Sequence, residues 1–117
     1  MSREKALEYY RNKNANRMNC AQAVIAAFKE KFGLSDDIVR LFASYGAGRA
    51  PGGECGACYA AKFMLKEKHP DEIQKCDEVF LSNAGSNKCR EIRKLKKLPC
   101  TGCVEKAAEF IEKIPGG

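Results

Sequence analysis

The stretch Asn19-Cys-Ala-Gln-Ala-Val-Ile-Ala-Ala-Phe-Lys-Glu-Lys-Phe-Gly33 decides the fold class of this chain. Asparagine favours the N-cap of a helix, and glycine favours its C-terminal end. Between these two residues, apolar side chains recur at spacings of three and four, which is typical of one helix face. They are Ala21, Val24, Ile25, Phe28 and Phe32. The stretch therefore predicts an amphipathic helix packed on a helical core.

The same periodicity continues on both sides of this stretch, and no segment alternates as a strand would. It predicts further helices over residues 3–12, from Ser35 to Tyr45, over about 53–68, from Pro70 to Gly85, from a Ser86 cap to Lys94, and from Pro99 to Pro115. A length of 117 residues fits one domain. We expect a single all-α domain over residues 1–117, a compact bundle of five to seven helices.

Composition excludes several classes of protein. The chain is 44% hydrophobic and 31% charged, and no apolar run approaches the roughly 20 residues that span a bilayer. Its first residues, Met-Ser-Arg-Glu-Lys, lead into a charged amphipathic stretch and not into an apolar signal region. We therefore expect a cytoplasmic protein with no membrane segment.

The net charge of +6 is concentrated in one segment. Residues 88–97 contain six basic side chains and a single acid, Glu91. Such a segment suits docking of an acidic redox partner or electrostatic support of nearby thiolates, and it also suits a solvated helix face. Nucleic-acid binding is not expected, because the segment is short and has no aromatic residues to stack on bases.

The cysteines point to metal or redox chemistry. There are seven, an odd number, so they do not form a fully paired disulfide scaffold. The single histidine, His69, excludes Cys2His2 zinc sites. Two C-x-x-C pairs occur, Cys55 with Cys58 and Cys100 with Cys103, and two such pairs are the usual cysteine pattern of a four-thiolate metal site. The 41 residues between the pairs exceed a zinc-ribbon spacing. This favours an iron–sulfur or zinc site assembled across the bundle.

The surroundings of each cysteine suggest its role. Cys55 follows a glycine-rich loop, and Cys100 follows Pro99; both stand where a helix is expected to begin, a setting that favours thiolate. We assign both as candidate catalytic thiols. Cys20 and Cys89 fit functional and packing roles equally well on pattern alone. Three glycines near Cys55 are expected to let a bound group approach closely: Gly52, Gly53 and Gly56. Packing is the favoured role for Cys58, Cys76 and Cys103.

Over most of its length the chain resembles the C_GCAxxG_C_C family of putative redox-active proteins. The resemblance rests on Cys20 in Asn-Cys-Ala-Gln, Cys55 in Cys-Gly-Ala, Cys89 in Asn-Lys-Cys-Arg-Glu-Ile, and Cys100 ahead of Val-Glu-Lys-Ala-Ala. Ala60 replaces the final glycine of the motif. The resemblance implies that these four cysteines form one site. A further similarity, to the non-haem part of split-Soret cytochromes, implies an iron–sulfur cluster and a homodimer. Covalent haem is not expected, because there is no C-x-x-C-H.

Three functions remain open on these grounds. The preferred one is electron transfer through an iron–sulfur cluster held by Cys20, Cys55, Cys89 and Cys100. The second is thiol–disulfide exchange, in which Cys55 attacks as a low-pKa nucleophile and Cys58 or Cys100 resolves the mixed disulfide. The third is an interaction module, zinc-stabilised or metal-free, whose cysteines mostly pack.

Overall fold

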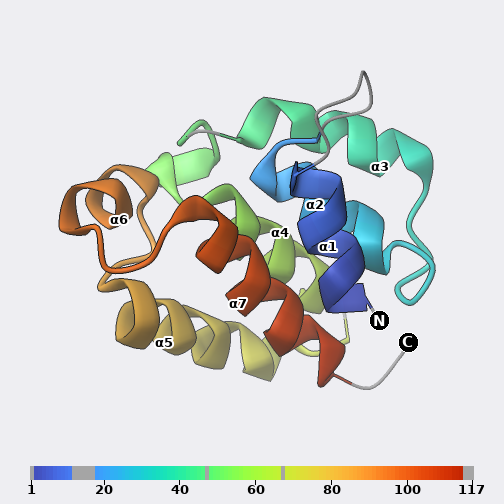
Figure 1. Cartoon of the computed structure of the whole chain (residues 1–117). Coiled ribbons are helices and arrows are strands. Elements are labelled where there is room, and N and C mark those ends of the chain that lie inside the picture. Colours follow the sequence, from blue (N-terminus) through green and yellow to red (C-terminus); the bar gives the residue numbers. More distant parts are fainter. Residues whose placement is uncertain (1, 12–17, 47, 67, 115–117) are drawn as a thin grey trace.

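The computed structural model describes residues 2–11, 18–46, 48–66 and 68–114 (Figure 1). Within these residues the chain forms seven α-helices and no strand beyond one isolated antiparallel bridge between Glu54 and Lys88. The helices are α1 (Ser2–Arg11), α2 (Cys20–Phe28), α3 (Asp36–Leu41), α4 (Gly56–Leu65), α5 (Ile73–Ala84), α6 (Cys89–Leu95) and α7 (Cys100–Glu112). Three single-turn 3-10 helices occur at Phe42–Tyr45, Pro51–Gly53 and Pro70–Glu72. The prediction of an all-α bundle is confirmed.

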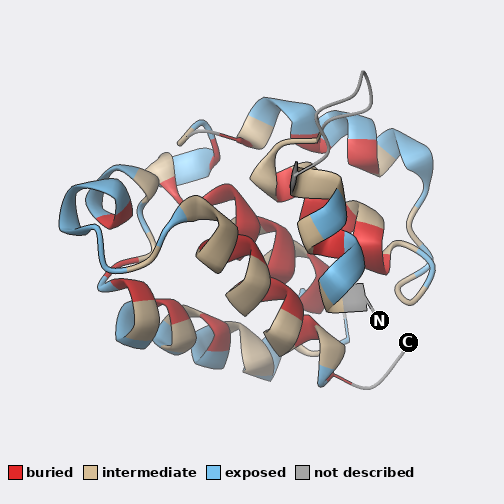
Figure 2. Ribbon diagram, in the orientation of Figure 1, coloured by how far each residue is buried: buried red, intermediate tan, exposed pale blue. Residues whose placement is uncertain are grey.

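Helices α2 and α4 form the centre of the bundle, and α7 packs against both of them and against α1 (Figure 1). Helix α5 covers α4 and α7 on one side, while α3 covers α2 on the other. Buried residues line the inner faces of these helices, whereas α6 is largely exposed (Figure 2). The largest fully buried side chains include Phe28, Phe42, Phe80, Leu65 and Ile111. None of the helices in the described part of the chain is long and apolar enough to cross a membrane.

The helix ends follow the expected capping chemistry. The Asn19 side chain accepts a hydrogen bond from the Gln22 backbone N–H, and the Gln22 side chain accepts one from the Asn19 N–H, so a capping box begins α2. Gly85, in the left-handed region at φ 83°, ends α5. Pro99 is the N-cap of α7. These residues fix where the flanking chain enters and leaves the bundle.

Two expected helix ends are displaced. Helix α2 ends at Phe28, five residues before the predicted end at Gly33, and Phe32 lies in the turn that follows. The N-cap of α6 is Lys88 and not Ser86. The Ser86 hydroxyl instead accepts a hydrogen bond from the Lys88 N–H at 3.0 Å and donates one to Glu91 at 2.6 Å. Serine can satisfy a backbone N–H two residues ahead in a turn as readily as at a cap, so sequence does not separate the two roles. The predicted end at Pro115 lies outside the described residues.

Candidate functional site

Five cysteines line one cavity of about 380 Å³, which we call the thiol pocket. They are Cys20, Cys55, Cys89, Cys100 and Cys103. Cys55 and Cys103 are buried, and the other three are half-buried. Met18, Ile92 and Tyr10 contribute to the rest of the wall. The four cysteines of the sequence motif, separated by as many as 80 positions, therefore lie around the same space.

Each of these four cysteines stands at the beginning of a different helix. Cys20, Cys89 and Cys100 are the first residues of α2, α6 and α7, and Cys55 is the N-cap of α4. The first N–H groups of a helix have no intrahelical partner, and the helix dipole adds partial positive charge there. Four helix ends thus meet at the thiol pocket and favour negative charge within it.

Glycines allow the helix ends to approach this closely. A Cβ on Gly56 would lie 2.7 Å from the Tyr45 carbonyl oxygen and 2.8 Å from the Cys20 sulfur. A Cβ on Gly48 would lie 3.7 Å from the Cys89 sulfur, an ordinary contact distance. Gly56 is therefore the residue that brings the start of α4 against Cys20.

The other two predicted glycines belong to a neighbouring cavity. Gly52 and Gly53 line a second pocket of about 750 Å³, which we call the basic pocket. Its wall consists of Gly48, Gly52, Gly53, Lys88, Cys89, Arg90, Glu91 and Arg93. Cys89 and Arg93 line both pockets. Of the three glycines assigned to binding a cofactor, only Gly56 borders the thiol pocket.

Cys55 does not have the low pKa expected of an attacking thiol. A thiol–thiol hydrogen bond with Cys103, followed by burial, raises the pKa of Cys55 well above its usual range. The N–H groups of Ala57 and Cys58 act in the opposite direction without overcoming these two effects. The direction of this shift runs against the prediction that Cys55 is a low-pKa nucleophile. Sequence shows the helix start, but it does not show the burial or the Cys103 contact.

Arg93 provides positive charge at the more exposed side of the thiol pocket. Burial raises the pKa of Cys89, while the Arg93 charge partly offsets that rise. The negative charge of Cys89 and a hydrogen bond to Cys100 together raise the pKa of Arg93. One guanidinium thus lies beside two of the four motif cysteines.

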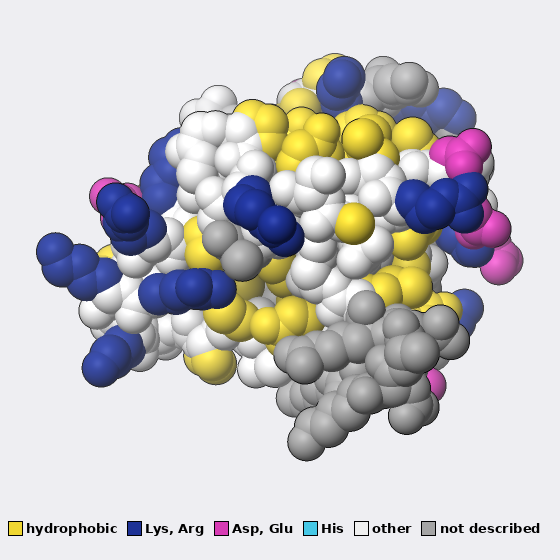
Figure 3. All heavy atoms as spheres, turned by 90° about the horizontal axis from the view of Figure 1, so that it is seen from above, with side chains coloured by type: hydrophobic (Ala, Val, Ile, Leu, Met, Phe, Trp, Pro, Cys, Tyr) yellow, Lys and Arg dark blue, Asp and Glu magenta, His cyan; other side chains and the backbone are white. Residues whose placement is uncertain are grey.

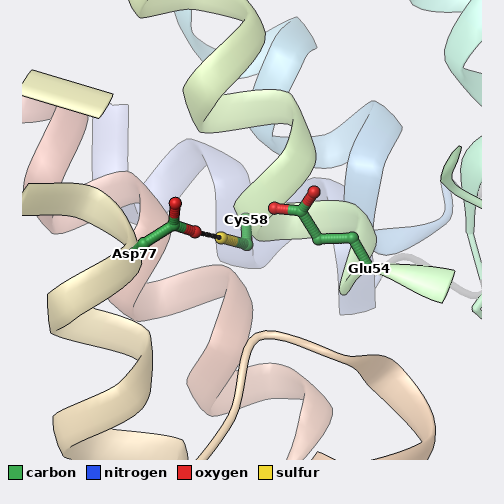
Figure 4. Close-up of side chains that lie close together, drawn as sticks. All are labelled: Glu54, Cys58 and Asp77. Atoms are coloured by element: carbon green, nitrogen blue, oxygen red, sulfur yellow. Dashed lines mark hydrogen bonds between the residues drawn. The ribbon is translucent and has the colours of Figure 1, made fainter. Parts of the chain in front are cut away.

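The remaining two cysteines lie in the core, apart from the thiol pocket. Cys76 belongs to α5 and its side chain is fully buried, as expected for a packing residue. A hydrogen bond to Cys76, followed by burial, raises the pKa of Cys58. The Cys58 thiol also donates to Asp77 at 3.8 Å, with Glu54 on its other side (Figure 4). Ligand atoms of Glu54, Cys58 and Asp77 all lie within 4.8 Å of one another.

This acidic cluster already has a cation from the chain itself. The Lys62 ammonium lies 2.6 Å from Glu54 and 2.9 Å from Asp77. Burial alone would lower the pKa of Lys62, but its hydrogen bonds to the two carboxylates raise it overall. Burial likewise tends to raise the pKa of Asp77, yet hydrogen bonds from Asn87 and Lys62 lower it. The cluster is an ion network of two carboxylates around one ammonium, and the Lys62–Asp77 pair connects α4 to α5.

The two C-x-x-C pairs are placed differently in the fold. Cys55 faces the thiol pocket, whereas Cys58 faces the ion network, so the first pair is divided. Cys100 and Cys103 both line the thiol pocket. Cys103 is buried, as its packing role requires, and is also a fifth thiol of the site. The predicted site did not include Cys103, and its C-x-x-C spacing from Cys100 is the signal that could have added it.

Comparison with known proteins gives one match. A family model described as "Putative redox-active protein (C_GCAxxG_C_C)" matches residues 18–114. That range contains every cysteine of the thiol pocket. No curated protein and no solved structure matches the chain.

Proposed function

The chain belongs to the C_GCAxxG_C_C family, and from this premise we propose that its thiol pocket binds an iron–sulfur cluster for electron transfer. The proposed ligands are Cys20, Cys55, Cys89 and Cys100. The observation that carries the proposal is the meeting of four cysteine-bearing helix ends around a cavity of about 380 Å³. Cysteine thiolates are the usual ligands of such clusters, which accept and donate single electrons when bound.

The donor set and its surroundings fit a cluster. Four thiolates bring negative charge into a partly buried space, where an uncompensated charge is costly. The helix dipoles and Arg93 offset that charge with fixed positive potential. Binding a cationic metal also removes the thiol protons, so the raised pKa of Cys55 is compatible with a ligand role.

Sulfur spacing favours a cluster over one zinc ion. Zinc–sulfur bonds of about 2.3 Å place tetrahedral thiolates about 3.8 Å apart. In residues 2–11, 18–46, 48–66 and 68–114, the one set of three candidate ligands within 4.8 Å of one another is Glu54, Cys58 and Asp77. No three thiols of the thiol pocket therefore lie within 4.8 Å of one another, and their side chains would have to move to share one ion. A multi-iron cluster can bridge wider gaps.

One side of the thiol pocket is more accessible than the other, and we expect electrons to enter and leave the cluster on that side. Cys55 and Cys103 form the buried side of the pocket, and Cys89 and Cys100 form its accessible side beside Arg93. The accessible side is the shorter path to a partner. The apolar wall, including Met18 and Ile92, limits the access of water.

Thiol–disulfide exchange remains a second candidate because the Cys55 and Cys103 thiols contact each other. In this reaction a pocket thiolate attacks the disulfide of a substrate and releases one substrate thiolate. A second pocket thiol then attacks the mixed disulfide and releases the other. The substrate gains two electrons, and the protein is left with one disulfide. The geometry makes Cys89 or Cys100, beside Arg93, a better attacking thiol than Cys55.

Anaerobic purification separates these candidates. Visible absorbance with iron and acid-labile sulfide supports the cluster, and alanine replacement of any of the four proposed ligands should abolish both. Cys76→Ala is the matched control, because Cys76 is a buried cysteine outside the pocket, and it should retain iron and sulfide. Stoichiometric zinc without colour contradicts the proposal. A metal-free protein that loses two titratable thiols on mild oxidation supports exchange instead.

A further inference from the structure

The basic pocket lies directly against the accessible side of the thiol pocket. Its volume of about 750 Å³ lies within the range of about 300–1,000 Å³ that small-molecule sites occupy. One wall is the glycine-rich loop and the other is α6. Figure 3 shows Lys and Arg side chains gathered at the α6 end of the molecule. This cavity combines positive charge with a concave shape.

The loop leaves room for an occupant. Gly52 and Gly53 have φ values of 72° and 74°, in the left-handed region that disfavours other residues. A Cβ on Gly53 would meet nothing within 4 Å, and one on Gly52 would meet only the Lys88 ammonium, at 3.4 Å. Open space therefore lies beside the loop at Gly53, with the Lys88 ammonium over Gly52.

The backbone holds the two walls together. Glu54 pairs with Lys88 in the antiparallel bridge, and the Cys55 N–H donates to the Asn87 carbonyl at 2.7 Å. These contacts tie the end of the loop to the residues just before α6. The backbone therefore fixes the positions of the glycine loop and of the start of α6, the two walls of the cavity.

Positive charges outnumber negative charges in the wall of the basic pocket. Lys88, Arg90 and Arg93 supply three cations, and Glu91 supplies one carboxylate, which already accepts a hydrogen bond from Ser86. Among the described residues, no ion pair involves any of the three cations. Cationic side chains that converge on a concave surface favour an anionic ligand.

We propose that the basic pocket binds a small molecule bearing phosphate or carboxylate groups and holds it next to Cys89. Lys88 and Arg90 recognise its anionic groups. Arg93 and Cys89, which line both pockets, form the connection to the thiol site. The placement of this molecule beside a cluster rests on the proposed function, whereas its binding does not.

Calorimetric titration of the full-length protein, as purified, tests the binding. Pyrophosphate and citrate serve as the phosphate and carboxylate probes. We expect saturable binding of at least one of them, and the tighter binder identifies the class of anionic group. Raising the ionic strength from about 0.01 to about 0.15 M should weaken binding strongly, because the Debye length falls from about 30 to about 8 Å.

A charge-matched pair of variants shows where the probe binds. Lys88→Gln with Arg90→Gln should weaken binding about tenfold. Lys94→Gln with Lys96→Gln removes the same charge from α6 and its C-cap outside the pocket, and it should change binding less than about twofold. Circular dichroism confirms that both proteins fold.

Two results would overturn the proposal. One is the absence of saturable binding for both probes. The other is equal weakening by both pairs of substitutions, which would show general attraction to a basic surface. Iron and sulfide content measured on the same samples reports on the cluster separately, so failure of one proposal is distinguishable from failure of the other.

Discussion

Replacing Gly56 by alanine tests whether the close approach of α4 and α2 shapes the thiol pocket. The new methyl group would lie 2.7 Å from the Tyr45 carbonyl oxygen, 2.8 Å from the Cys20 sulfur and 3.1 Å from the Ala21 Cβ. The first of these atoms belongs to the backbone, so a side-chain rotation cannot relieve the contact. The start of α4 must move away from the 3-10 helix that contains Tyr45 and from α2.

Two opposing effects set the size of the change. Alanine is favoured over glycine within a helix by up to about 1 kcal/mol. Overpacking of a tight interface costs about 1–3 kcal/mol. Because Gly56 is buried against three neighbours, we expect the second effect to prevail, with a net loss of about 1–2 kcal/mol and a fall in melting temperature of about 5 °C.

Gly102→Ala is the matched control for this substitution. Gly102 lies in the first turn of α7, as Gly56 lies in that of α4. Its Cβ would lie 2.6 Å from the Leu98 Cδ1, 2.9 Å from the Leu98 Cγ and 3.3 Å from the Pro99 Cδ; the first two atoms move with rotation of the Leu98 side chain, and none of the three is a backbone atom of another element. Urea unfolding should show Gly102→Ala near or above the wild type in stability. The reasoning is refuted if Gly56→Ala is as stable as Gly102→Ala and retains full iron and sulfide.

Three further predictions concern the charged groups. Lys62→Met should lower the free energy of unfolding in urea by about 2–3 kcal/mol, because it leaves two partly buried carboxylates without their cation. The control Lys94→Met, on the exposed surface, should lower it by less than about 0.5 kcal/mol. The pKa of Asp77 in the folded protein lies below the unfolded value of about 3.9. The ionised Asp77 therefore stabilises the folded protein fully above the unfolded pKa, and this contribution to the free energy of unfolding is lost as the pH falls through the folded pKa. Asp77→Asn should therefore lower the unfolding free energy at neutral pH and flatten its pH dependence below about pH 4, and an unchanged acid limb would contradict this. Arg93→Gln should slow iodoacetamide labelling of Cys89 about threefold in metal-free protein, read by peptide mass spectrometry, whereas Lys94→Gln should not.

Local rules accounted for the helices because their ends are encoded nearby in sequence. Asn19 and Gln22 are spaced as a capping box, Gly85 can adopt a left-handed conformation, and Pro99 interrupts one helix before the next. Ser86 failed as a cap because the same hydroxyl can satisfy a turn. The bundle was therefore predictable, while the start of α6 was misplaced by two residues and the end of α2 by five.

The thiol pocket was predictable only in outline. Cys100 and Cys103 both lie inside a helix, where a spacing of three keeps side chains on one face. Cys55 is an N-cap with an extended backbone, φ −58° and ψ 127°, so helical spacing does not relate it to Cys58. Identical spacing thus gives one joined pair and one divided pair. The expected acidic partner, homodimer and cytoplasmic location remain predictions.

The bridge between Glu54 and Lys88 also sets a register. Glu54 and Cys55 are consecutive residues in extended conformation, and their side chains serve opposite sites, the ion network and the thiol pocket. A slip of one residue in this pairing would exchange the two faces. Inserting a single residue into the preceding loop would therefore place the Glu54 carboxylate where the Cys55 sulfur belongs, and deleting one would place the sulfur where the carboxylate belongs. The length of this loop sets which side chain enters each site. The loop before Cys55 should therefore tolerate substitutions far better than insertions or deletions.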